Sequence, residues 1–167
     1  MIKTSRAGLA AKAGHDLTIE VTRWSAQVQL PGPDAGGLAA ATVAVDLDLG
    51  SLEIREGSGG AMPLTSRDRN EIKKTMTKIL GAGQASFRSS QVLPADPGGA
   101  IDGTLTAHGK SAPVRLQVSE PAPGRYTATG SVAQTALGIK PYTGFFGALK
   151  LKDEVTLDID VTLPAPV

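Results

Sequence analysis

Polar and apolar residues alternate along most of this chain, and the alternation limits the fold more than any other feature of the sequence. Successive side chains of a β-strand point to opposite faces, so a period of two predicts strands with one dry and one wet face, which pair antiparallel. The clearest run ends the chain, where apolar residues alternate with polar ones from Val155 to Leu163. Such runs predict about eight strands. They cover residues 17–21, 24–30, 43–49, 85–93, 101–107, 114–118, 126–132 and 155–163.

One segment has a different period and predicts a single amphipathic helix over residues 66–80 that lies on the sheet. Thr65 or Ser66 is expected as its N-cap, because a hydroxyl accepts hydrogen bonds from first-turn amides. Gly81 or Gly83 is expected as its left-handed C-cap. The apolar residues at helical spacing are Ile72, Met76, Ile79 and Leu80.

An antiparallel sheet of this size must stack on a second sheet or close on itself, and closure removes the exposed edges. We therefore expect an all-β fold, an antiparallel eight-stranded barrel with one helix, formed by a single domain over residues 1–167. The alternation slips by one residue between Val21 and Trp24, which predicts a bulge or a sharp bend. Residues 31–37 (PGPDAGG) predict a turn.

Composition excludes several classes of function. The net charge of +1 gives no basic surface for nucleic acid, and the absence of cysteine excludes disulfides and thiolate chemistry. No window approaches the roughly 18 apolar residues of a transmembrane helix. The N-terminus lacks the apolar core of a secretory signal. We expect a cytoplasmic protein, or a periplasmic or secreted one if a leader has been removed.

The adjacent pair His15 and Asp16 raises the question of catalysis. Neighbours in a strand face opposite sides, and the chain has no G-x-S-x-G elbow, so a hydrolase dyad is disfavoured. We expect instead that one of these side chains ties the start of the strand to nearby backbone, or that His15 lies at the barrel mouth beside a ligand. His108 is expected as a solvated turn residue. Two histidines without zinc spacing predict no metal site, and no cofactor is expected.

Three other features are candidates. Asp68 in the first helical turn favours the helix dipole, while Arg67 beside it is a candidate to hold a polar head group at the barrel rim. The segment KPYTGFFGALK, residues 140–150, is expected to line an entrance, cover one barrel end or plug the core. The single tryptophan, Trp24, is expected in the core.

The order of these features resembles the YceI-like family of bacterial lipid-binding proteins. The likeness rests on DGTLTAHGKSAPVRLQV (residues 102–118), Arg67-Asp68 at the head of the helix, ASFRSS (residues 85–90) and SVAQTALGI (residues 131–139). This resemblance implies an extended lipocalin-like barrel that binds a long isoprenoid or another lipid chain. Aromatic residues are only 4% of the chain, so small aliphatic residues would line such a cavity.

We therefore expect a lipid-binding protein for storage or transport, without enzymatic activity. Two alternatives stay open: a small isomerase or cyclase that uses His15 for proton transfer, and a ligand-free stress or interaction protein with a solid barrel. A homodimer also stays open. The expected ligand-binding residues are His15, Leu17, Ile19, Val28, Val45, Leu47, Arg67, Phe87, Leu105, Leu116, Val132, Phe145 and Phe146.

Overall fold

The structure is a computed structural model that describes residues 1–32 and 37–163. Within these residues the chain forms thirteen strands and one α-helix, α1, which spans Ser66–Leu80. The predicted turn over residues 31–37 falls largely outside the described part. The strands are β1 (Ile2–Lys3), β2 (Arg6–Ala7), β3 (Asp16–Val21), β4 (Trp24–Gln29), β5 (Thr42–Asp48), β6 (Leu52–Ser58), β7 (Gln84–Pro94), β8 (Gly99–Ala107), β9 (Lys110–Ala122), β10 (Arg125–Ala133), β11 (Thr143–Gly144), β12 (Leu149–Leu151) and β13 (Glu154–Thr162).

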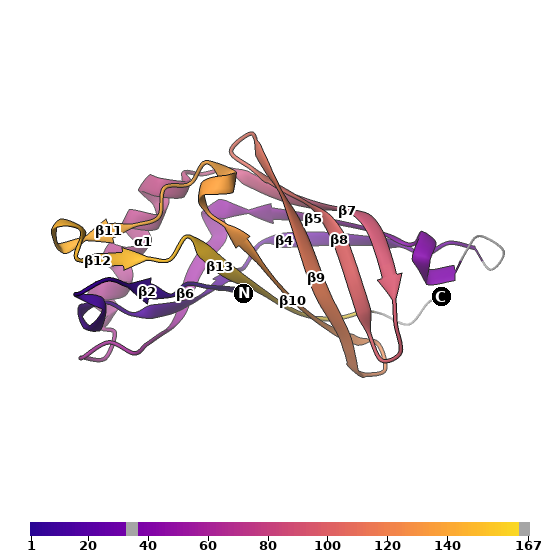
Figure 1. Cartoon of the computed structure of the whole chain (residues 1–167), viewed down its shortest axis with the longest axis horizontal. Coiled ribbons are helices and arrows are strands. Elements are labelled where there is room, and N and C mark those ends of the chain that lie inside the picture. The colour runs from indigo at the N-terminus through magenta and orange to yellow at the C-terminus, as the bar shows by residue number, and fades with distance from the viewer. Residues whose placement is uncertain (33–36, 164–167) are drawn as a thin grey trace.

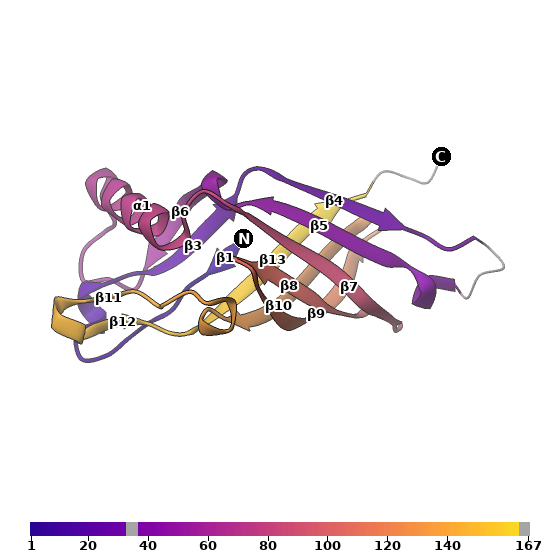
Figure 2. The ribbon, with the colours of Figure 1, turned by 90° about the horizontal axis from the view of Figure 1, so that it is seen from above.

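Ten of these strands form one antiparallel sheet in the order β4-β5-β7-β8-β9-β10-β13-β1-β3-β6. A small second sheet has the order β11-β12-β2 and lies at the same end of the elongated molecule as α1 (Figures 1 and 2). The large sheet curls into a half-barrel, which confirms the prediction of an all-β antiparallel fold with one helix.

The predicted count of eight strands is wrong, and so is full closure of the barrel. The terminal strands of the large sheet, β4 and β6, are not paired with each other among the described residues. Five strands were missed: β6 has seven residues, and the other four are short, since β1, β2 and β11 have two residues each and β12 has three. Two or three residues cannot show a period of two, so alternation had no means to find them.

A hydrogen-bonded corner joins the two ends of the sheet. The chain bends at Thr22 and Arg23 as it passes from β3 to β4, so the phase slip is confirmed as a sharp bend. Ser51, only 3% exposed, lies inside the corner. Its hydroxyl accepts a hydrogen bond from the Arg23 amide (2.9 Å) and donates one to the Asp48 carbonyl (2.8 Å). The Thr22 hydroxyl donates to the Ser51 carbonyl (2.8 Å). These bonds hold the β3–β6 pair against the β4–β5 pair.

Helix α1 begins and ends where the sequence predicted. Thr65 is the N-cap: its hydroxyl accepts from the Asp68 amide (3.2 Å), and the Asp68 carboxylate accepts from the Thr65 amide (2.9 Å). The Thr65 hydroxyl also donates to the same carboxylate (2.6 Å), and the two bonds from Thr65 hold the pKa of Asp68 below its usual range, because both favour the charged carboxylate. Gly81 is the C-cap with φ of 63°, but its ψ of −175° lies outside the left-handed helical region that was expected.

The helix packs against β3 and β6 and covers an edge of the large sheet. Its apolar face joins a buried cluster of Leu17, Ile19, Val21 and Leu52. Arg69 donates from Nη1 to the backbone carbonyls of Ile54 (2.9 Å) and Arg55 (3.2 Å) in the edge strand β6. An edge strand with free backbone groups invites aggregation, and this contact occupies two of them.

We predict that Thr65→Ala lowers the free energy of unfolding by about 1 kcal/mol, because it removes the side-chain half of the capping box. Urea denaturation followed by circular dichroism measures the change. The control is Thr77→Ala, an exposed position within the same helix whose hydroxyl bonds only to the Lys73 carbonyl. Equal stability of the two variants would contradict the assignment of Thr65 as the cap.

Candidate functional site: a hollow barrel interior

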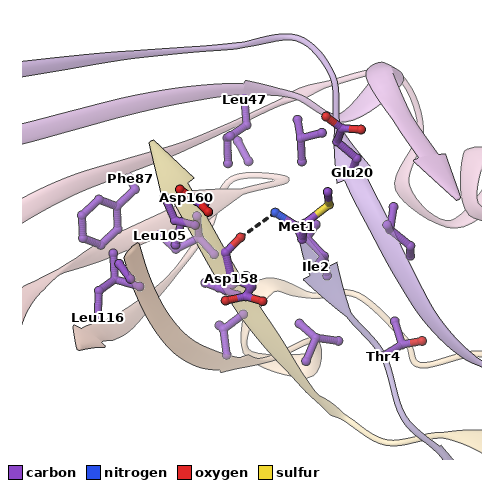
Figure 3. A pocket seen from close by; sticks show the side chains of 18 of the residues that line it. Met1, Ile2, Thr4, Glu20, Leu47, Phe87, Leu105, Leu116, Asp158 and Asp160 are labelled. Carbon is purple, nitrogen blue, oxygen red and sulfur yellow. Dashed lines mark hydrogen bonds between the residues drawn. The ribbon is translucent and has the colours of Figure 1, made fainter. Parts of the chain in front are cut away.

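A cavity of about 1850 Å³ lies between the inner face of the curled sheet and helix α1. Figure 3 shows Leu47, Phe87, Leu105 and Leu116, from four different strands, around this space. The apolar face of the helix contributes Ile72, Met76 and Ile79 to the wall. The cavity extends along the molecule, since its wall includes Met62 near one end and Tyr126 near the other.

The interior is hollow because the inward side chains do not fill it. Among the described residues no large side chain is less than 2% exposed, although a solid core of this chain length would contain several. The buried residues instead fall into two clusters, one on β7–β10 and β13 and one beneath the helix, and Ile2 and Leu47 contact both. The solid-barrel interpretation therefore does not describe this structure.

Phe87 shows how the wall is built. It lies in β7 opposite Leu105 of β8 and is 6% exposed. Two residues before Leu105, Gly103 has no side chain, and a Cβ there would stand 2.4 Å from Cζ of Phe87. The glycine therefore lets the ring lie against the strand. An aromatic side chain held against the wall leaves the middle of the cavity open.

Eleven of the thirteen residues expected at a ligand site lie on the cavity wall, and two do not. Arg67 is exposed in the first turn of α1, one position away from the helix face that carries Asp68, Glu71 and Ile72. Phe146 is fully exposed and is not part of the cavity wall. The residues on the wall are His15, Leu17, Ile19, Val28, Val45, Leu47, Phe87, Leu105, Leu116, Val132 and Phe145.

The expectation that Trp24 lies in the core is wrong. It is 50% exposed in the terminal strand β4 and lines the open side of the cavity, as does Val28 at 39%. The alternation of β4 identified the inward face correctly, but no layer of the described residues covers this face.

Sequence reasoning also left part of the wall out of the candidate site. The helix stripe was recognised as apolar, yet only its packing on the sheet was considered. The inward residues of the last strand showed the clearest alternation in the chain and were not listed as site residues either. These missed wall residues are Ile72, Met76, Ile79, Leu80, Val155, Leu157, Ile159 and Val161.

His15 and Asp16 bond to different backbone groups. His15 Nε2 hydrogen-bonds with the Met62 carbonyl (2.8 Å), and the ring lies against Gly60, where a Cβ would stand 2.4 Å from Nε2. Asp16 accepts from the Arg6 amide (2.7 Å), and Arg6 Nη1 donates to the Gly14 carbonyl (2.8 Å). The pair does not form a dyad; each side chain anchors the start of β3 to a neighbouring segment, as one of our interpretations had it.

The cavity wall also carries a few polar groups. Near its middle, the Met1 amino group donates to the Asp158 carbonyl (2.6 Å; Figure 3), and burial lowers the pKa of this amine. At the end near Tyr126, burial and then the charge of Glu120 raise the pKa of the phenol. Most of the wall between these groups is apolar.

The second histidine, His108, lies outside the cavity wall. His108 is exposed in the turn between β8 and β9, as predicted, with φ of 52° beside Gly109 at 69°. Such paired positive angles belong to the tight turns of hairpins. Within residues 1–32 and 37–163, no three histidine, aspartate or glutamate side chains gather as a metal site would require. The helix of the described chain is neither long nor apolar enough to cross a bilayer.

Comparison with known proteins gives a family-level match. The family model of the YceI-like domain matches residues 2–163. A Campylobacter jejuni YCEI protein that crystallizes with large solvent channels aligns with a TM-score of 0.56 at 14% identity, over 87% of this chain and 83% of that chain. A mutant of that protein with a monobromobimane guest aligns with a TM-score of 0.58 at 15% identity, over the same shares. At such identities these structures show a shared fold. No curated protein matches the sequence significantly.

We predict that Gly60→Ala displaces the His15 ring and lowers the free energy of unfolding by about 1 kcal/mol, because the hydrogen bond to Met62 is lost. Thermal denaturation and the imidazole NMR signals of His15 measure the two effects. Gly83→Ala is the control, since a Cβ at Gly83 meets nothing within 4 Å. An unchanged His15 signal in Gly60→Ala would contradict the anchoring role.

Proposed function

Because the chain belongs to the YceI-like family, we propose that it binds a long-chain isoprenoid or another lipid inside the barrel, for storage or transport. The observation that carries this proposal is the cavity of about 1850 Å³ with a largely apolar wall. Pockets for drug-sized ligands measure roughly 300–1,000 Å³, so this space suits a larger molecule. Its extension along the molecule suits a chain more than a compact ring system.

The energetics of an apolar chain agree with this wall. Each methylene transferred from water to an apolar interior contributes about 0.8 kcal/mol. A ligand of many methylenes or isoprene units therefore gains affinity from length, with few polar contacts. The inward residues of the wall are mainly leucine, isoleucine, valine and alanine, which leave room that bulky aromatics would fill.

The proposal assigns no chemistry to the site. A proton-transfer role for His15 would require its ring to face a substrate, but Nε2 is engaged by the Met62 carbonyl and the ring is packed on Gly60. Asp16, the neighbouring carboxylate, serves the Arg6 amide. We propose binding without turnover, and a hydrophobic substrate converted by the protein but not by His15→Ala would overturn this.

We predict that the protein purified from cells carries lipid, because an apolar cavity of this size is more stable filled than exposed to water. Native mass spectrometry followed by extraction and identification of the bound molecules is the measurement. Delipidated protein should then bind an added long-chain isoprenoid and melt at a higher temperature. Absence of both copurified lipid and isoprenoid binding would contradict the proposed function.

We predict that Leu105→Trp weakens isoprenoid binding about tenfold or more, because the larger side chain occupies ligand space. In a hollow barrel the melting temperature of the ligand-free protein should change little, whereas overpacking a solid core typically costs about 1–3 kcal/mol. Val132→Phe tests the same effect on β10. The matched control is Thr104→Trp, one residue earlier on the outer face of β8, which should bind normally. Strong destabilisation by both inward variants would contradict a hollow interior.

A further inference from the structure

We propose that one end of the molecule docks on an anionic lipid membrane and that ligand enters and leaves the cavity there. This end, the apolar tip, is defined by Leu9, Met62, Phe145 and Phe146. The inference rests on the proposed function for its purpose, but the docking surface itself is argued from exposure, charge and the path of the cavity.

The apolar tip exposes large side chains to an unusual degree. Phe146 is 114% exposed, Leu9 101%, Met62 74% and Phe145 62%. Scattered exposed apolar residues are ordinary, but a cluster of them on one end marks an interaction site. Exposed side chains of this size are also the groups that insert into the headgroup and acyl boundary of a bilayer.

Three loops bring these residues to the same end of the molecule. The Ala10 amide donates to the Ala148 carbonyl (2.9 Å), which joins the loop of Leu9 to the β11–β12 hairpin. The Ala61 amide donates to the Lys12 carbonyl (2.9 Å), which joins the loop of Met62 to the same segment. Figures 1 and 2 both show the β11–β12 hairpin and the segment after β2 at the end of the molecule beside α1.

The backbone holds the phenylalanines outward in a strained conformation. Phe145 and Phe146 have φ of 49° and 55°, a region that bulky residues rarely adopt. The turn is closed by the Ala148 amide, which donates to the Phe145 carbonyl (3.1 Å), and by pairing of Gly144 with Leu149. Glycine would fit this turn without strain. Strain retained at exposed aromatic residues is a feature of functional sites.

The charges around the tip favour an anionic surface. Lys12, Arg67 and Lys150 are exposed there and form no ion pair within the described part of the chain. The carboxylates of Asp68, which is bound in the helix cap, and of Glu56 on β6 offset two of these three cations and leave an excess of one positive charge among these groups. Lysine and arginine beside inserted apolar residues strengthen binding to anionic lipids.

The cavity has its open side along β4, but its wall also reaches this tip and differs in charge at its other end. Lys12, Met62 and Phe145 belong to the cavity wall, so the interior is continuous with the apolar tip. At the opposite end the described wall residues include the carboxylates of Asp96 and Glu120. Those carboxylates would repel anionic headgroups, although Leu30 and Leu38 are also exposed there. The charge difference selects the tip as the membrane-facing end.

Docking at the tip would let a lipid ligand move between the bilayer and the cavity without exposing its hydrocarbon chain to water. A long hydrocarbon chain that crosses water loses the free energy that its burial supplies. When the rim of an apolar cavity is inserted in the bilayer boundary, the chain passes from one apolar phase to another.

The first experiment measures vesicle binding by flotation, with neutral phosphatidylcholine vesicles and with vesicles that contain phosphatidylglycerol. We expect the protein to float with the anionic vesicles, and added salt to weaken binding because it screens the lysines. Leu9→Ser with Phe146→Ser should reduce binding about tenfold or more, since the inserted side chains are lost. Leu38→Ser, at the other end, is the control and should bind normally. Equal binding by the two variants would overturn the proposal.

A fluorescence experiment locates the contact. In a Trp24→Phe background, Phe146→Trp should show a blue-shifted emission on anionic vesicles, while Leu38→Trp in the same background should not. The reverse pattern would overturn the assignment of the tip. If the serine variants instead convert a dimer into a monomer and the wild type floats with no vesicle, the tip is an interface between copies of this chain.

Ligand binding is measured separately by isoprenoid titration without vesicles, and thermal melts confirm that each variant folds. The Leu9→Ser, Phe146→Ser variant should retain ligand binding, because neither residue belongs to the cavity wall. Ligand binding without vesicle binding would overturn docking and leave the proposed function standing. Vesicle binding without ligand binding would overturn the proposed function and leave docking standing.

Discussion

The backbone ladder of the large sheet carries this fold, because the inward side chains leave open a large cavity that most domains would fill. The antiparallel pairs β7–β8, β8–β9 and β10–β13 run over nearly their whole lengths. On their outer faces, Arg115 binds both carboxylate oxygens of Asp102 (2.6 Å each), and Arg125 binds both of Asp160. Such exposed pairs add little free energy each, but their two-point geometry favours one register. Backbone pairing and the ion pairs on the outer face thus hold the strands together. The sheet therefore does not require its inward side chains to pack against one another across the interior.

A sheet that encloses a cavity is weakest where neighbouring strands share few backbone hydrogen bonds. In this protein other contacts reinforce such positions. β1 supplies only two residues between β13 and β3, so the sheet is thin at that position. The corner around Ser51 joins β3–β6 to β4–β5 through buried hydrogen bonds, and α1 covers β6 through Arg69. β4 has no comparable cover among the described residues, and its side chains stay exposed along its whole length. The barrel is therefore open along this strand, which is where Trp24 and Val28 face the cavity.

Features that depend on residues close together in the sequence were predicted well, and features that depend on contacts between distant segments were not. The bounds of helix α1 were predicted closely, because the Thr65–Asp68 cap and the apolar stripe are local patterns. Strand faces were also predicted well, since alternation depends only on backbone geometry. Trp24 was misjudged because alternation identifies a face and not what covers it. Phe146 was misjudged because its left-handed turn breaks alternation. Strand order, the two-residue strands and the width of the interior depend on contacts between distant segments, which a single sequence does not display.

The chemistry of the wall determines what the proposed binding can distinguish. Specificity by hydrogen bonding needs buried polar groups that a wrong ligand would leave unpaired. In the described chain no buried side-chain nitrogen or oxygen lacks a partner, and the cavity wall is mainly aliphatic. The deep part of the cavity, as formed by the described residues, therefore offers no unpaired polar side-chain atom to bind a ligand head group. Affinity would instead rise with each methylene buried and stop rising when the chain fills the available length. The barrel would then select ligands by length and thickness, and the polar residues near Tyr126 or the apolar tip would contact only what protrudes.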